Sequence, residues 1–148
     1  MKNFFHVTDN FDRQAKLDGI FEYPVSPTKA RLGVGLYVLE SRESAQKYLS
    51  MLAEASGRTL SEFSIIEYKI PDDELGKLSQ QPFEYGEELG KFMDEYSLLY
   101  SSNPKLLEGS PYDVDIISAP YGEYGREFLF RRNAQAVARK YQIVHKVR

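Results

Sequence analysis

Helix-like and strand-like spacings of hydrophobic residues alternate along the chain, without repeats or low-complexity segments. The clearest helix follows the capping residue Ser41, carries apolar residues at i, i+3, i+4 and i+7 from Ala45 to Leu52, and ends at Gly57. Two more helices are predicted over 9–18 and 83–100. The residues expected to face inward are Phe11, Ala15 and Leu17 in the first of these and Leu89, Phe92, Met93, Tyr96, Leu99 and Tyr100 in the second.

Apolar runs between these segments predict the strands. They are 4–7, 32–39, 63–70, 113–118, 127–131 and 141–147. Pro71 stops the third strand and precedes a short helical or turn segment, 21–29 is a proline-containing loop, and turns are expected at 119–125 and 133–140. The last three strands follow one another too closely for crossover helices, which favours antiparallel pairing there. We therefore expect one α+β domain over 1–148.

Composition excludes several kinds of site. The chain has no cysteine, which excludes disulfides, iron–sulfur clusters, thiolate zinc sites and cysteine nucleophiles. Its two histidines, His6 and His145, give no metal-ligand pattern with the scattered carboxylates, so no metal is expected. No apolar run reaches the roughly 18 residues of a membrane span, and the first residues lack the pattern of a signal peptide.

The net charge of −3 is unevenly distributed. Residues 126–148 carry seven Lys and Arg against one acid, a charge of +6, and the remaining chain carries 12 basic and 21 acidic residues, a charge of −9. A basic end can contact phosphates, although a solvated, salt-bridged strand pair explains it better. The acidic remainder argues against general affinity for nucleic acid.

Three residues are candidates for chemistry. The common phosphate-loop and nucleophile-elbow motifs are absent. His6 ends the first strand, Tyr37 follows a Gly-x-Gly segment, and Glu127 opens a strand after a glycine-bearing turn. Taken alone, each also fits a structural role: a hydrogen-bonded core histidine, a packing tyrosine and a solvated or ion-paired glutamate, the last with Arg126 or Arg131 as its partner.

In order and spacing these segments resemble the NAD-binding and catalytic elements of the ADP-ribosyltransferase superfamily. The likeness is to the histidine–tyrosine–glutamate branch, which includes the poly(ADP-ribose) polymerases and diphtheria toxin. The matching segments are His6-Val7-Thr8, Gly33-Val34-Gly35-Leu36-Tyr37, Ser44-Ala45 with Tyr48, Glu127-Phe128-Leu129-Phe130, Gln135 and Lys140-Tyr141. The strand at 112–117 is similar to one in small bacterial toxin relatives.

Two departures bear on this resemblance. Val7 stands where the family has glycine beside the nicotinamide, so its backbone N–H and C=O would still clamp the carboxamide while its side chain would crowd the pocket. The helix after Tyr37 needs a one-residue shift to align Ser44. The arginine-specific branch carries Glu-x-Glu, but Gly125 occupies the first of those positions, so arginine is not expected as the acceptor.

The resemblance implies a fold and a set of roles. The fold would have two small antiparallel sheets that form an NAD cleft with flanking helices. Glu127 would hydrogen-bond the ribose 2′-hydroxyl and face the developing positive charge, as carboxylates do in glycosidases. Tyr37 would stack on nicotinamide and His6 would bind the adenosine ribose. The remaining NAD-binding residues would be Val7, Thr8, Gly35, Ser44 and Tyr48, with Arg31 and the loop 21–29 over the adenosine and phosphates.

The implied activity is NAD-dependent mono-ADP-ribosyl transfer by a toxin or effector. NAD would be the substrate, and Tyr121 and Tyr124 would either contact the acceptor or simply pack the turn. The acceptor would be a protein or nucleic acid, and an antitoxin or immunity protein is a possible partner. The protein would act in the cytoplasm or after delivery into a target cell. The alternatives are an NAD glycohydrolase with water as acceptor and an inactive binding module of the same fold, for which Val7 is the main argument.

Overall fold

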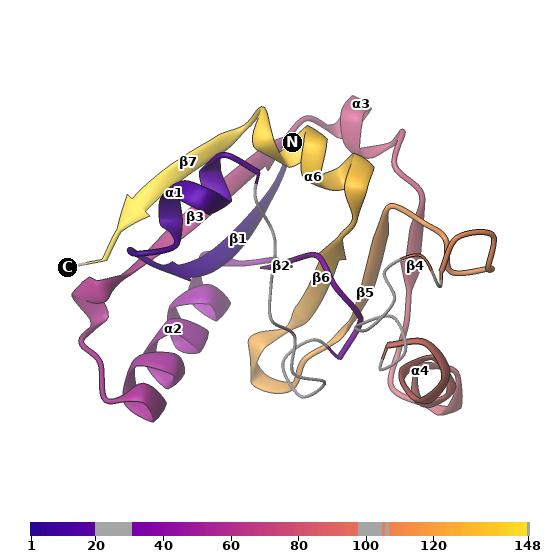
Figure 1. Cartoon of the computed structure of the whole chain (residues 1–148), viewed down its shortest axis with the longest axis horizontal. Coiled ribbons are helices and arrows are strands. Elements are labelled where there is room, and N and C mark those ends of the chain that lie inside the picture. Colours follow the sequence, from indigo (N-terminus) through magenta and orange to yellow (C-terminus); the bar gives the residue numbers. More distant parts are fainter. Residues whose placement is uncertain (20–30, 98–104, 106, 148) are drawn as a thin grey trace.

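The structure is a computed structural model that describes residues 1–19, 31–97, 105 and 107–147. Its strands form one seven-stranded sheet in the order β4-β5-β6-β2-β1-β3-β7 (Figure 1). The strands are β1 Lys2–Asp9, β2 Leu36–Leu39, β3 Phe63–Ile70, β4 Gln80–Pro82, β5 Ile116–Pro120, β6 Arg126–Phe130 and β7 Gln142–Lys146. Neighbouring strands pair antiparallel, except that β4 and β5 pair in parallel.

The expectation of two separate sheets is wrong, because one pair of residues joins the two halves. Phe5 of β1 pairs with Leu39 of β2, whereas β1 and β3 pair along their whole length from Lys2–Ile70 to Asp9–Phe63. One half-sheet is therefore β4-β5-β6-β2 and the other is β1-β3-β7. Beyond the Phe5–Leu39 pair, β1 and β2 run beside each other without further pairing.

Five helices accompany the sheet in the described part of the chain. They are α1 Arg13–Leu17, α2 Arg42–Ser56, α3 Asp72–Leu75, α4 Glu87–Phe92 and α6 Arg132–Arg139. Short helical turns are η1 Leu60–Glu62, η2 Met93–Ser97 and η3 Gly122–Tyr124. In the view of Figure 1, α2 and α4 lie at the lower side of the sheet and α3 and α6 at the upper side. None of these helices has the length and apolar character of a membrane-crossing segment.

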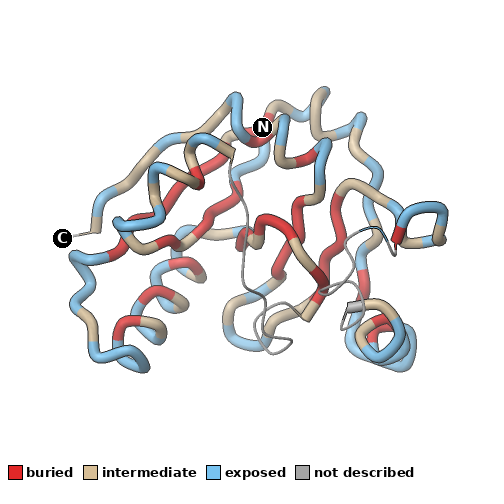
Figure 2. Tube along the Cα trace, viewed as in Figure 1, coloured by how far each residue is buried: buried red, intermediate tan, exposed pale blue. Residues whose placement is uncertain are grey.

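The core lies along the strands, which carry most of the buried residues (Figure 2). One group of buried side chains, including Phe4 and Phe130, packs with Ala134 and Ala138 of α6. Two further groups pack with α4 and α2. Strand alternation separates these groups, so that Phe4 belongs to the α6 group and Phe5 to the α2 group. The sheet is thus covered on both faces.

The elements whose ends carry capping or stop residues lie where the sequence predicts them. The Ser44 backbone N–H donates to the Ser41 hydroxyl at 3.0 Å, and Gly57 ends α2 in the left-handed conformation with φ of 67°. β3 has the predicted bounds and stops before Pro71, and α3 follows it. The antiparallel pairing of β5 and β6 is confirmed, while β7 finds its antiparallel partner in β3.

Other predictions need correction. Phe11 is 93% exposed rather than turned inward, because α1 begins only at Arg13. The expected turn at 133–140 is instead the helix α6, whose two alanines are buried. The helix expected at 83–100 is α4 followed by the π-helical turn η2, and Leu99 and Tyr100 lie outside the described residues. The strand expected at 32–39 is shortened to β2.

Candidate active site

Adjacent strands bring the three candidate residues into one region of the sheet. His6 lies on β1, Tyr37 on β2 and Glu127 on β6, and these strands are neighbours in the order β6-β2-β1. Leu39 pairs with both Phe5 and Glu127, so these residues form one row across the three strands. Because strands lie about 4.8 Å apart, β1 and β6 are separated by about 10 Å.

His6 is held by the backbone of the tyrosine-bearing strand. Its Nδ1 lies 2.6 Å from the Tyr37 carbonyl oxygen, and since a carbonyl only accepts, Nδ1 donates and Nε2 carries a free lone pair. Burial and the charge of Lys16 lower the pKa of His6 to about 3, so the ring is neutral at physiological pH. Nε2 is buried and has no hydrogen-bond partner among the described residues. It is therefore a buried acceptor that no described donor satisfies.

A cavity of about 310 Å³ opens beside His6. It is lined by β1 together with residues of α1, α2 and the segment between α2 and β3. Its polar lining residues are His6, Thr8, Asp9, Asp12, Lys16, Ser56 and Arg58. The lining combines cations with carboxylates, which suits a ligand that carries both hydroxyl and anionic groups.

Glu127 is buried and paired with an arginine. Its Oε1 accepts from Arg31 Nε at 3.1 Å. Burial raises the pKa of Glu127 to about 7, although the Arg31 guanidinium opposes this rise. The partners suggested by the sequence are wrong, because Arg126 pairs with Glu84 and Arg131 with Asp113.

Arg31 also connects Glu127 to the turn between β5 and β6. Its Nη2 donates to the Pro120 carbonyl at 2.8 Å, and its Cζ lies 4.7 Å from the centre of the Tyr121 ring. The expected position of Arg31 over the adenosine and phosphates stays untested, and the accompanying loop 21–29 lies outside the described residues. What the structure adds is a direct contact of Arg31 with the candidate catalytic carboxylate.

Tyr37 is anchored through its hydroxyl. The hydroxyl donates to the Gly33 carbonyl and accepts from the Leu32 N–H at 3.1 Å. The ring packs against the buried group that contains Leu129. These contacts fix the ring, while its stacking on nicotinamide stays a prediction.

The side chains of His6 and Glu127 leave the sheet on opposite faces. Glu127 shares its face with Leu39 and Phe5, its row partners, whereas alternation directs His6 to the other face of β1. Val7 accordingly packs against the group that contains Phe5. The cavity beside His6 does not include Glu127, so within the described residues these two side chains do not share a cavity.

The need for glycine at position 35 is explained by the close packing of β2 against β6. A Cβ at this position would lie 2.7 Å from Leu129 Cδ1 and 2.7 Å from the Phe130 carbonyl oxygen. Gly35 therefore allows a close approach of β2 to β6, and a contact of Gly35 with NAD stays a prediction.

The turn tyrosines pack together with Tyr48. Ring centroids lie 6.3 Å apart for Tyr48 and Tyr121, 5.4 Å for Tyr48 and Tyr124, and 5.3 Å for Tyr121 and Tyr124. Burial, with a contribution from Glu127, raises the pKa of Tyr48 to about 12. Ser44 belongs to the α2 cap, where its hydroxyl accepts from the Ser41 hydroxyl at 2.9 Å. The packing interpretation of the turn is thus supported, and acceptor contact is untested.

Sequence reasoning missed Lys16, which is buried and lines the His6 cavity. Burial lowers its pKa to about 8. Periodicity assigned the inward face of this segment to Ala15 and Leu17, and nothing in the spacing marked a lysine as inward. Within the described ranges, no group of three or more His, Asp or Glu side chains is arranged to hold a metal ion.

Comparison of the chain with protein-family models and with curated proteins finds no match.

Proposed function

We propose that this chain is an NAD-dependent mono-ADP-ribosyltransferase. The observation that carries the proposal is the state of His6, a neutral imidazole whose Nδ1 donates to the Tyr37 carbonyl and whose buried Nε2 lacks a partner in the described chain. A buried polar atom without a partner costs about 1–3 kcal/mol. A ribose hydroxyl would remove that cost by donating to Nε2.

Glu127 supplies the second part of the argument. In the proposed reaction the bond between ribose C1′ and the nicotinamide nitrogen breaks, and its electron pair leaves with neutral nicotinamide. The acceptor atom then bonds to C1′ and releases its proton. The ionised Glu127 carboxylate would stabilise the positive charge that develops on the ribose. Because Glu127 lies on β6, two strands from His6, NAD would have to extend across the sheet to reach both residues.

Two assays test the proposal. The first measures nicotinamide release from NAD by chromatography. The second measures transfer of label from NAD to the proteins and nucleic acids of a lysate. We expect Glu127→Gln to slow release by about 100-fold or more, because a group that acts mainly in the transition state contributes this much. NAD affinity, measured by calorimetry, should change little. The matched control is Glu54→Gln, which removes an exposed carboxylate of α2 and should leave release unchanged.

The outcomes separate the alternatives. Full activity of Glu127→Gln would contradict the mechanism. Release without transfer would identify an NAD glycohydrolase.

An inactive binding module is the second candidate, and the Arg31–Glu127 pair favours it because the carboxylate already has a partner. The absence of both NAD binding and nicotinamide release in the wild-type protein would support that module.

A further inference from the structure

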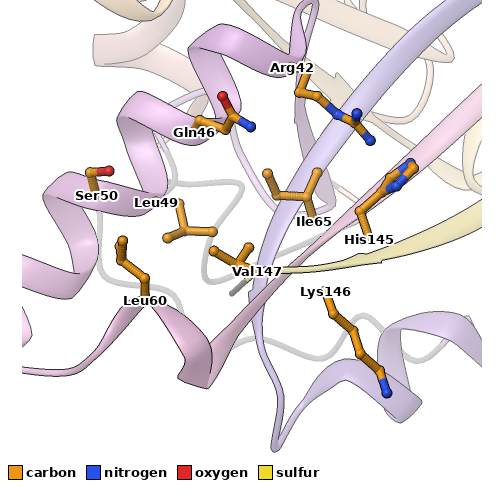
Figure 3. Close-up of a pocket in the computed structure, with 9 residues that line it drawn as sticks. All are labelled: Arg42, Gln46, Leu49, Ser50, Leu60, Ile65, His145, Lys146 and Val147. Carbon is orange, nitrogen blue, oxygen red and sulfur yellow. The ribbon is translucent and has the colours of Figure 1, made fainter.

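A second hollow lies on the far side of α2 from the tyrosine turn. It has a volume of about 510 Å³, within the range of small-molecule sites. Figure 3 shows its lining, which comes from α2, η1, β3 and the end of β7. We call it the α2–β7 groove.

The helix α2 presents different residues to the α2–β7 groove and to the turn that carries Tyr121 and Tyr124. Arg42, Gln46 and Ser50 recur every four residues and line the α2–β7 groove. Ser44 lies two positions after Arg42 and Tyr48 two positions after Gln46, and two positions correspond to about 200° around the helix. The groove therefore lies on a different face of α2 from Ser44 and Tyr48, and it shares no lining residue with the cavity beside His6, so an inference about it does not depend on the proposed function.

The groove has an apolar floor and a polar wall. Leu49 and Ile65, each 2% exposed, form the floor together with Val147. Leu60, which is 43% exposed, borders one end. The polar wall is the α2 stripe, which spans about 12 Å from Arg42 to Ser50.

One end of the groove carries a single available positive charge. Among the described residues, the Arg42 guanidinium has no hydrogen-bond or ion-pair partner, and in Figure 3 it points toward the ring of His145. The Nε2 atom of that ring already forms a hydrogen bond of 2.8 Å with Glu67 Oε1. The Lys146 ammonium points away from the centre of the groove in the same view. None of the lining residues is acidic.

We propose that the α2–β7 groove binds an amphipathic monocarboxylate. The carboxylate pairs with the Arg42 guanidinium, whose planar fork matches two carboxylate oxygens, and the apolar chain lies on Leu49, Ile65 and Val147. A single anionic charge fits better than two, because only one cation is available and the buried Glu67 carboxylate lies behind His145.

Calorimetric titration with octanoate and, separately, with 1-octanol tests this proposal on the full chain. Octanoate should bind more tightly than the alcohol. Arg42→Gln should weaken octanoate binding by about tenfold or more, since a hydrogen bond to a charged group contributes that much, and should leave octanol binding unchanged. Lys47→Gln is the matched control, because it removes an exposed α2 charge outside the groove.

A second variant fills the groove without touching a charge. Ser50→Phe, at an exposed lining position, should abolish binding of both probes while circular dichroism shows an unchanged fold. The proposal is overturned if octanoate does not bind the wild-type protein. It is equally overturned if octanoate and octanol bind alike, or if Arg42→Gln and Ser50→Phe bind octanoate as the wild type does.

Discussion

The Glu127 carboxylate experiences two opposing effects. Burial raises its pKa to about 7, and the Arg31 guanidinium 3.1 Å away limits that rise. Because the proposed reaction needs the ionised carboxylate, nicotinamide release should increase as the pH rises through about 7. Arg31→Gln removes the opposing charge, so the midpoint of the rate–pH curve should move to higher pH.

This shift is measured from the initial rate of nicotinamide release at a series of pH values. Arg126→Gln is the matched control, because Arg126 precedes Glu127 in the chain but pairs with Glu84. Its midpoint should equal that of the wild type. An unchanged midpoint in Arg31→Gln would show that Arg31 does not control the ionisation of Glu127.

Single residues also mark the limit of what sequence could predict about the site. Local patterns place His6, Tyr37 and Glu127 on strands, whereas the neighbourhood of those strands comes from the assembled sheet. The pairing of Glu127 with Arg31, 96 residues away in the chain, depends on how the strands assemble, which no local pattern contains. The same holds for the burial of Lys16.

At the scale of secondary-structure elements, Gly35 sets the spacing of β2 and β6. Gly35→Ala would place a methyl group 2.7 Å from both Leu129 and the Phe130 carbonyl, so we expect a loss of about 1–3 kcal/mol in the free energy of unfolding. Gly90→Ala in α4 is the contrasting variant, because nothing lies within 4 Å of its added Cβ. It should stabilise the protein by up to about 1 kcal/mol. Urea denaturation measures both, and equal stability of the two variants would contradict this account.

Elements were predictable where capping or stop residues mark their ends. Ser41 and Gly57 delimit α2, and Pro71 ends β3. The helix α6 was missed because Arg132–Arg139 contains one large apolar residue, Val137, and so shows no apolar helical period, although its alanines favour a helix and pack on the sheet. The short strand β4 was missed for a similar reason, since its pairing with β5 alone makes Gln80–Pro82 a strand.

At the scale of the whole molecule, His6 links global stability to pH. Its pKa is about 3 in the folded protein and about 6.5 in an unfolded chain, so folding disfavours its protonation. The associated stability is complete above about pH 6.5 and is lost as the pH falls toward 3. Glu127 acts in the opposite direction, because its raised pKa favours the protonated folded state as the pH falls through about 7.

Comparison of His6→Gln with the wild type isolates the histidine contribution, since Glu127 is common to both proteins. Relative to the wild type, the variant should gain about 2 kcal/mol between roughly pH 7.5 and pH 5. Urea denaturation at both pH values provides the measurement. A stability difference that does not change with pH would show that His6 titrates normally in the folded protein.

The single Phe5–Leu39 pair has a mechanical consequence for the molecule. A sheet bends most easily where the fewest strand hydrogen bonds cross it, so we expect this sheet to bend most readily along the line between β1 and β2. In that motion the two half-sheets would move as two plates about this line. A molecule bound to both plates acts as a brace, and its affinity includes the entropic cost of stopping that motion. Any change that stiffens the line before binding lowers this cost.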